Sequence, residues 1–241
     1  MKRQIKKQPI GILGGMGPQA SAHLLDLLIN LSIKEFGARD NNDFPEIVLD
    51  SVSVPDFISS TQKSNALNIL VDRVRFLDAI EPSCMAIACN TAHVFLDALQ
   101  SASKTHFISM IEEVAKSVDS FELKKVGIMG TPVTIKSMLY QRALSRLGIE
   151  AVEPTRNELE ILELIIRKVI AGAVSKSDES FLLFVANRLM SRGAEGIILG
   201  CTELPLIFPK DHKMPIFNSL EILAKALLRK YYKFNTIREK S

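Results

Sequence analysis

The sequence has few cysteines, no long apolar run and almost no excess of either charge. Three cysteines in 241 residues do not make a disulfide framework, so reduced thiols are expected. No apolar stretch approaches the roughly 20 residues that a membrane-spanning helix needs. The net charge of +3, from 30 basic and 27 acidic residues, gives no general case for nucleic-acid or membrane binding.

The N-terminus lacks a convincing export signal. It is basic, but the apolar part that follows is interrupted by four glycines: Gly11, Gly14, Gly15 and Gly17. With reduced thiols and no export signal, we expect a cytoplasmic protein. The composition, 47% apolar and 24% charged, is otherwise that of an ordinary globular chain with one large domain or two small ones.

Predicted strands and helices alternate along the whole chain. Apolar runs predict strands at 10–13, 46–54, 85–88, 106–110, 126–129, 150–153 and 196–199. Amphipathic segments predict helices at 18–36, 64–80, 92–101, 133–147, 157–170, 176–191 and 220–232. This order is typical of an α/β fold with parallel-stranded sheets.

The two halves of the chain share a pattern of glycine turn and cysteine. The turn at 11–18 resembles the turn at 127–132, and a cysteine follows each at nearly equal spacing, Cys89 and Cys201. We therefore predict two similar α/β domains, residues 1–104 plus 215–241 and residues 105–214. The segment 214–217 and the helix 220–232 have no evident counterpart in the repeat, so we expect them to return to the first domain.

Cys89 and Cys201 each end an apolar run and are followed by polar residues. Such a run is typical of a buried parallel strand, and the carboxyl ends of these strands are where α/β proteins place their sites. Backbone N–H groups at the start of the next helix favour thiolate. The neighbouring Asn90, Thr91 and Thr202 offer the neutral donors that suit a carboxylate. Cys84 lacks such a polar turn and is interpreted as a small core residue.

Other motifs leave alternatives open. The glycine turn is not the dinucleotide fingerprint, and a tight turn near a small ligand fits it better. Asp56 is either a ligand contact or a turn residue. Cys89 and His93 could be half of a metal site, but no second cluster completes it, so we predict no metal. Glu203 is either an acid at a helix N-terminus or a group that tunes the thiol of Cys201.

These motifs together resemble the cofactor-independent aspartate/glutamate racemase family, and aspartate racemases in particular. The resemblance rests on Gly14–Pro18, Cys89–His93, Ser109–Glu113 and Gly200–Glu203, and extends over nearly the whole chain. It implies two Rossmann-like domains with the active site in the cleft between them, usually in a homodimer.

The resemblance also implies an activity, namely interconversion of L- and D-amino acids without pyridoxal phosphate or metal. Cys89 and Cys201 would be the two catalytic thiols, one taking the Cα proton and the other returning a proton to the opposite face. By the same resemblance, the substrate contacts would be Met16, Asn90, Thr91 and Thr202.

The chain departs from the aspartate racemase pattern at two positions. Phe57 and Ile170 stand where the family carries an arginine and a lysine that hold the substrate's side-chain carboxylate. Either the substrate is not acidic, or another cation takes this role; the candidates are Arg156, Arg167 and Lys168.

Three alternatives to a racemase stay open at this point. The first is another enzyme of the same scaffold, such as a maleate isomerase, a hydantoin racemase or an arylmalonate decarboxylase. The second is a small-ligand-binding protein without turnover. The third, a thiol redox protein, is disfavoured because the cysteines are not in a Cys-x-x-Cys arrangement.

Overall fold

The computed structural model describes residues 7–55, 60–210 and 212–239. The chain forms two compact units, each described here by itself. The first takes in the chain up to Ala88, Phe95–Ser109 and the chain from Leu223, and the second contains Cys89–Val94 and Met110–Ile222. The domain boundaries expected from the sequence stay a prediction.

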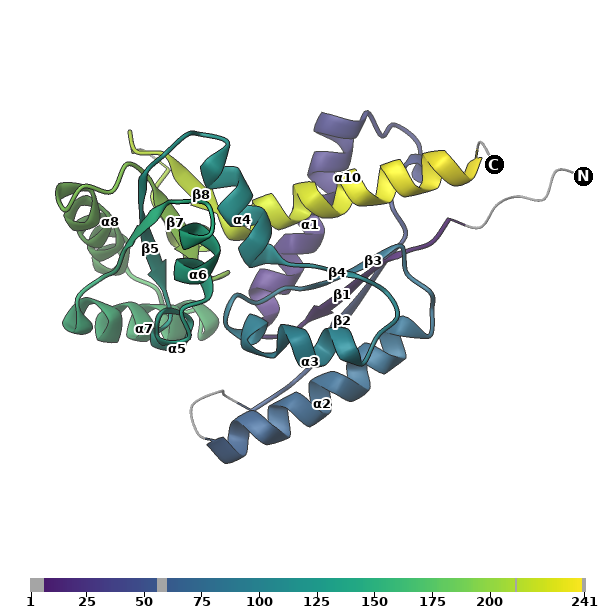
Figure 1. The fold of residues 1–241 in the computed structure, drawn as a ribbon, viewed down its shortest axis with the longest axis horizontal. Helices are drawn as coiled ribbons and strands as arrows, with labels where there is room; N and C mark the ends of the chain where they lie inside the picture. Colours follow the sequence, from purple (N-terminus) through teal and green to yellow (C-terminus); the bar gives the residue numbers. More distant parts are fainter. Residues whose placement is uncertain (1–6, 56–59, 211, 240–241) are drawn as a thin grey trace, which may run out of the picture. The chain divides into compact units, whose positions relative to one another are not determined.

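The first unit is built on a four-stranded parallel sheet with the order β2-β1-β3-β4 (Figure 1). Its strands are β1 (Ile10–Gly14), β2 (Ile47–Ser51), β3 (Cys84–Ile87) and β4 (Phe107–Ile108). The two central strands, β1 and β3, are buried along their full length. They are therefore continuous apolar runs rather than alternating ones, as parallel strands covered on both faces must be.

Helices cover the first sheet on both faces. Figure 1 shows α2 (Ser60–Asp78) and α3 (Leu96–Ser101) on one face and α1 (Pro18–Phe36) on the other. Pro18 stands at the start of α1, where its missing N–H costs no helical hydrogen bond. Gly37 ends the helix in the left-handed conformation with φ 73°. A short 3-10 helix, η1 (Asn41–Asp43), follows.

The second unit repeats this topology. Its parallel sheet has the order β6-β5-β7-β8, from β5 (Lys125–Gly130), β6 (Glu150–Val152), β7 (Ile197–Gly200) and β8 (Ile216–Asn218). The predicted α/β fold with two parallel sheets is therefore confirmed. One expectation was wrong: β8 takes the place beside β7 that β4 takes beside β3, so the segment at 214–217 does have a counterpart.

Some predicted elements differ in the structure. The expected helix at 133–147 is two helices, α5 (Pro132–Lys136) and α6 (Leu139–Ser145), because Met138 adopts a left-handed conformation with φ 56°. The expected strand at 106–110 stops early, because Met110 begins α4 (Met110–Asp119). The remaining helices are η2 (Thr91–Phe95), α7 (Arg156–Ile170), α8 (Lys176–Ser191) and α9 (Leu204–Ile207).

The last helix, α10 (Ser219–Glu239), begins in the second unit and from Leu223 onward belongs to the first. In the first unit it packs beside the end of α1. The Lys225 ammonium lies 3.2 Å from the Glu35 carboxylate, and the Tyr232 ring stacks on Phe36 with centroids 4.7 Å apart. None of the described helices combines the length and the apolar character that crossing a membrane requires.

Candidate active site

Cys89 and Cys201 follow equivalent strands and belong to the same unit. Cys89 comes two residues after the end of β3, and Cys201 directly follows β7. Both are buried, with 6% and 5% of their surface exposed. Cys89 is one of the groups that raise the pKa of Cys201.

The thiol of Cys89 lies in a turn that offers backbone donors. Burial raises its pKa to about 12, and the negative charge of Glu203 adds to the rise. The backbone N–H groups of Ala92 and Thr91 donate toward the sulfur and oppose this shift. Cys89 is therefore protonated at neutral pH, but its thiolate has donors already in place.

Cys201 has a carboxylate as its direct partner. Its Sγ donates to Glu203 Oε2 at 3.0 Å, and the hydroxyl of Thr202 donates to the same oxygen at 3.0 Å. Glu203 is itself only 3% exposed. Burial and then the Glu203 charge raise the pKa of Cys201 well above its ordinary value. Glu203 thus has both of the roles open from the sequence: it stands at the N-terminus of α9, and its carboxylate raises the pKa of the Cys201 thiol.

Asn90, which follows Cys89, is held by a buried network. Tyr140 donates its hydroxyl to Asn90 Oδ1 at 2.5 Å, and Asn90 Nδ2 donates to Ser219 Oγ at 3.1 Å. Ser219 in turn donates to the Leu199 carbonyl at 2.8 Å. An amide nitrogen carries two hydrogens, and these contacts use one. The network therefore fixes the orientation of the Asn90 amide.

The hydroxyl of Thr91 belongs to a cluster of three threonines. Thr91, Thr131 and Thr134 have their Oγ1 atoms 3.0 Å apart in each pair. Thr131 directly follows β5 and caps α5 by accepting from the Thr134 N–H. In the sequence, Thr131 stands out only as part of the repeat, and no pattern points to Tyr140. The signal for Thr131 was its position at a strand end, as for the two cysteines.

His93 has both ring nitrogens engaged by the backbone. The Met110 N–H donates to Nε2 at 3.1 Å, so Nε2 is unprotonated and Nδ1 must carry the hydrogen. Nδ1 then donates to the Cys89 carbonyl at 2.8 Å. Burial lowers the pKa of His93 to about 4. His93 is therefore neutral and stabilises the Cys89 turn through these two hydrogen bonds. Within the described residues, no group of three or more His, Cys, Asp or Glu is placed to hold a metal ion.

The other residues predicted for the site lie in different settings. Thr202 is buried in the second unit beside Glu203. Met16 is half-buried in the turn between β1 and α1 of the first unit. Asp56 and Phe57 lie outside the described residues. The structure thus gathers Cys89, Cys201 and the polar residues that follow them within one unit, whereas Met16 belongs to the other.

The three cations proposed as substitutes for the family's arginine and lysine lie on α7, and each has a carboxylate partner. The pairs are Arg156 with Glu160 at 3.0 Å, Arg167 with Glu163 at 2.7 Å and Lys168 with Asp178 at 2.7 Å. These cations are therefore engaged in ion pairs within α7 or between α7 and α8.

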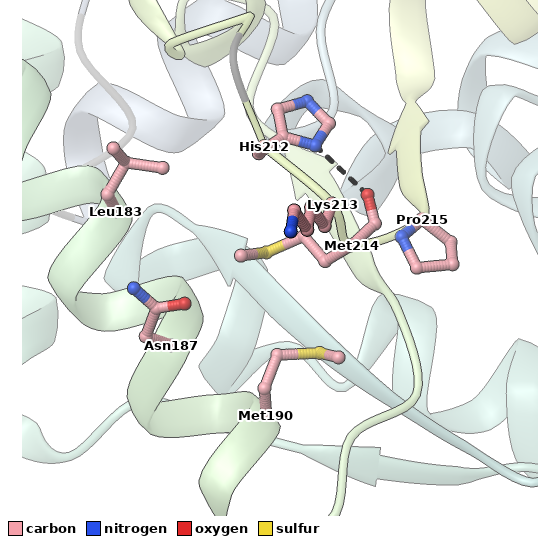
Figure 2. A pocket seen from close by; sticks show the side chains of 7 residues that line it. All are labelled: Leu183, Asn187, Met190, His212, Lys213, Met214 and Pro215. Carbon is pink, nitrogen blue, oxygen red and sulfur yellow. Dashed lines mark hydrogen bonds between the residues drawn. The ribbon is translucent and has the colours of Figure 1, made fainter.

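A surface groove of about 530 Å³ lies elsewhere in the second unit. Figure 2 shows Leu183, Asn187 and Met190 of α8 facing the segment 212–215 that leads to β8. His212 Nδ1 and the Met214 carbonyl lie 3.0 Å apart there. None of the residues predicted for the site lines this groove, so it is a separate feature from the thiols.

Comparison with known proteins gives consistent matches over nearly the whole chain. Residues 13–227 match the family described as Asp/Glu/hydantoin racemase. A broad specificity amino-acid racemase of Bacillus subtilis is 27% identical over 231 residues, which cover 94% of this chain and 100% of the relative.

Two solved structures resemble this one closely. An aspartate racemase homologue from Pyrococcus horikoshii is 28% identical with a TM-score of 0.78, and the match covers 93% of this chain and 99% of the other. The Picrophilus torridus aspartate racemase is 27% identical with a TM-score of 0.78, covering 92% of this chain and 94% of the other.

Proposed function

Since this chain belongs to the Asp/Glu/hydantoin racemase family, we propose that Cys89 and Cys201 are the two acid–base groups that invert an amino acid. The chain is accordingly an amino-acid racemase, an isomerase. The observation that supports the two-thiol assignment is the matched position of the cysteines, each following a central strand of one repeated topology, together with the effect of Cys89 on the pKa of Cys201.

The proposed reaction moves one proton off Cα and a different one onto it. One sulfur, as thiolate, takes the proton from one face and becomes a thiol. The other, as thiol, donates its proton to the opposite face and becomes a thiolate. The same pair works in either direction with the roles exchanged, so the assignment needs no further acid or base at the carbon.

Charge that develops on the substrate carboxylate during this step has donors available. The amide of Asn90, the hydroxyl of Thr91 and the backbone N–H of Thr202 are the groups we assign to it. Asn90 and Thr202 are almost fully buried, and hydrogen bonds to charge are strongest where water is excluded. The Tyr140–Asn90–Ser219 network keeps the amide in place, so no reorganisation is needed during the reaction.

We assign a substrate with an uncharged side chain rather than aspartate or glutamate. The family's two cations are replaced by Phe57 and Ile170, and the three substitutes on α7 are engaged by carboxylates. The Bacillus subtilis relative carries the name of a broad specificity amino-acid racemase, which agrees with a site that does not demand a second carboxylate.

The test is deuterium entry at Cα. Single enantiomers of neutral and acidic amino acids are incubated with the protein in D₂O, and chiral chromatography with mass spectrometry reports inversion and label. We expect exchange with inversion for neutral amino acids. Cys89→Ala and Cys201→Ala should each lower this rate by at least about 10³-fold, because each removes an obligatory proton carrier.

Cys84→Ala is the matched control. It removes the third buried thiol, which lies within β3, and should leave turnover close to that of the parent protein. Inversion that survives loss of either Cys89 or Cys201 would refute the two-thiol mechanism. Preference for aspartate or glutamate over neutral amino acids would refute the substrate assignment alone.

A further inference from the structure

The hydroxyl of Ser219 does not cap the helix that this residue begins. Ser219 is the first residue of α10, but two N–H groups of the first turn donate to the side-chain oxygen of Asn218, at 3.0 and 3.3 Å. The Ser219 hydroxyl instead donates to the Leu199 carbonyl at 2.8 Å and accepts from the Asn90 amide at 3.1 Å. Helix capping therefore does not explain this buried serine.

We propose that Ser219 and Tyr140 are positioning residues that determine which end of the Asn90 amide is presented to the substrate's α-carboxylate. This inference rests on the racemase reaction and the carboxylate contact proposed above, and extends them to the residues that orient the amide. A carboxylate only accepts hydrogen bonds, so it binds the NH₂ end of an amide and is repelled by the oxygen end. The orientation of the amide therefore decides whether Asn90 attracts or repels the substrate.

The direction of these hydrogen bonds follows from a backbone carbonyl. The Leu199 carbonyl cannot donate, so the single hydrogen of the Ser219 hydroxyl is used on it. Ser219 Oγ then accepts from Asn90, which places Nδ2 of the amide toward the serine. The other end of the amide is Oδ1, and the Tyr140 hydroxyl donates to it at 2.5 Å. A reversed amide would bring two oxygens together at Ser219 with no hydrogen between them.

Tyr140 is held in place as a donor. Its side chain is fully buried, and a Cβ on Gly200 would fall 2.9 Å from a carbon of its ring, so the ring packs directly against the end of β7. Burial raises the pKa of the Tyr140 hydroxyl, which therefore keeps its proton. Tyr140 thus fixes the oxygen end of the amide, as Ser219 fixes the nitrogen end.

The network is enclosed and lies within one unit. Asn90, Tyr140 and Ser219 are 1%, 0% and 0% exposed, and all three belong to the second unit. Hydrogen bonds are electrostatically stronger in such an interior than in water, and water does not readily replace a lost partner there. Loss of either hydroxyl should therefore release the amide from its single orientation.

The first readout is kcat/KM for a racemised amino acid, measured in a double-mutant cycle with Asn90→Ala. Ser219→Ala and Tyr140→Phe each remove one hydroxyl and should each lower kcat/KM about tenfold, the effect of one hydrogen bond to a charged group. Asn90→Ala should lower kcat/KM about 10²-fold. In the Asn90→Ala background, loss of either hydroxyl should change kcat/KM by no more than about twofold, because the hydroxyl acts only through the amide.

Matched variants separate this role from a structural one. Ser219→Thr keeps the hydroxyl and should stay within about threefold of the parent. Ser32→Ala removes another buried hydroxyl, which donates to the Leu28 carbonyl in α1, and Tyr231→Phe removes a buried phenol hydroxyl of the first unit. Both controls should leave kcat/KM within about twofold of the parent. Losses that add in the cycle would overturn the proposal, because a merely structural effect persists without Asn90.

The second readout does not need turnover. With selective ¹⁵N-asparagine labelling, the side-chain NH₂ signal of Asn90 is identified by its absence in Asn90→Ala, and its hydrogen exchange is measured by NMR. Ser219→Ala should speed this exchange at least about tenfold, whereas Ser219→Thr should stay close to the parent. Exchange that is unchanged in Ser219→Ala would overturn the proposal. Because no substrate is present, this result is distinct from failure of the racemase assignment, which would show as absence of Cα exchange in the parent.

Discussion

At the scale of single residues, the Cys89 turn depends on the hydrogen bonds of a histidine. His93 accepts from the Met110 N–H and donates to the Cys89 carbonyl, so two buried backbone groups have their partners in one ring. Each such group would cost about 1–3 kcal/mol if left without a partner. The position of the thiol is thus coupled to the uncharged state of His93.

His93 should make stability depend on pH in the acidic range. Its pKa in the folded protein is about 4, below the ordinary 6.5. Between these two pH values the unfolded chain therefore binds a proton on His93 that the folded protein does not bind. The contribution of neutral His93 to the free energy of unfolding is complete above pH 6.5 and is lost as the pH falls toward 4. We expect the parent to lose about 3 kcal/mol of unfolding free energy more than His93→Gln over this range, measured by urea denaturation.

Glutamine is the chosen substitute because its amide can donate to one backbone group and accept from the other, but does not titrate. All other ionisable groups are common to both proteins, so the difference between the two pH curves isolates His93. Parallel curves from pH 7 to pH 4 would contradict the assignment of a buried neutral imidazole.

How far the site could be predicted also becomes clear at this scale. The sequence predicts Cys89 and Cys201 because a thiol at a strand end followed by polar residues is visible in it. Tyr140 could not be found that way. Its ring lies against Gly200, where an added Cβ would fall 2.9 Å from it, and its hydroxyl reaches Asn90. That contact joins residues 50 positions apart, and no local pattern encodes it.

At the scale of elements, the turn between β1 and α1 is determined by a close approach of two backbones. Gly15 has φ 91°, and a Cβ there would fall deep inside the backbone of Val52. The Gly15 N–H donates to the Ser21 hydroxyl at 2.8 Å, which fixes the turn to α1. The close approach of the Val52 backbone therefore explains why a glycine is required here, and no bound ligand is needed to explain it.

Gly15→Ala should destabilise the protein considerably more than Gly37→Ala. Both glycines have positive φ, but nothing lies within 4 Å of the Cβ position at Gly37. Gly37→Ala should cost only the left-handed strain, about 1–2 kcal/mol, whereas at Gly15 the backbone of Val52 must also move. Thermal unfolding of both variants measures the difference in stability. Equal losses of stability would show that the close approach of Gly15 to Val52 adds no energetic cost to the substitution.

Most elements were predictable because their apolar periodicity is local. The break between α5 and α6 was not, because Met138 is an ordinary helix former and takes φ 56° only in its tertiary setting. The range predicted for β4 is too long for a related reason. The apolar run continues into Met110 and Ile111, which are buried in α4 instead. Apolar residues alone do not say whether a run stays a strand.

At the scale of the whole molecule, the repeat explains how one topology supplies two thiols. The sheets β2-β1-β3-β4 and β6-β5-β7-β8 have the same order, and the cysteines follow the equivalent strands β3 and β7. Although β3 belongs to the first unit, residues 89–94 belong to the second, so both thiols and their polar neighbours are in one unit. The sequence repeat indicates that Cys89 and Cys201 occupy equivalent positions. It does not indicate that residues 89–94 belong to the second unit.

The C-terminal helix α10 contributes to the first unit through its aromatic residues, and this leads to the last prediction. The Tyr231 side chain is 1% exposed, and its hydroxyl accepts from the Glu46 N–H at 3.4 Å. Tyr231→Ala should cost about 3–5 kcal/mol because a large buried ring is lost. Hydrogen exchange should then show lost protection in β1 and β2, with β5 and β7 changed far less, since the ring packs within the first unit.

Tyr231→Phe, which keeps the ring, should lose about 1 kcal/mol or less. Equal loss of protection in all four strands would show instead that the two units unfold as a single cooperative body.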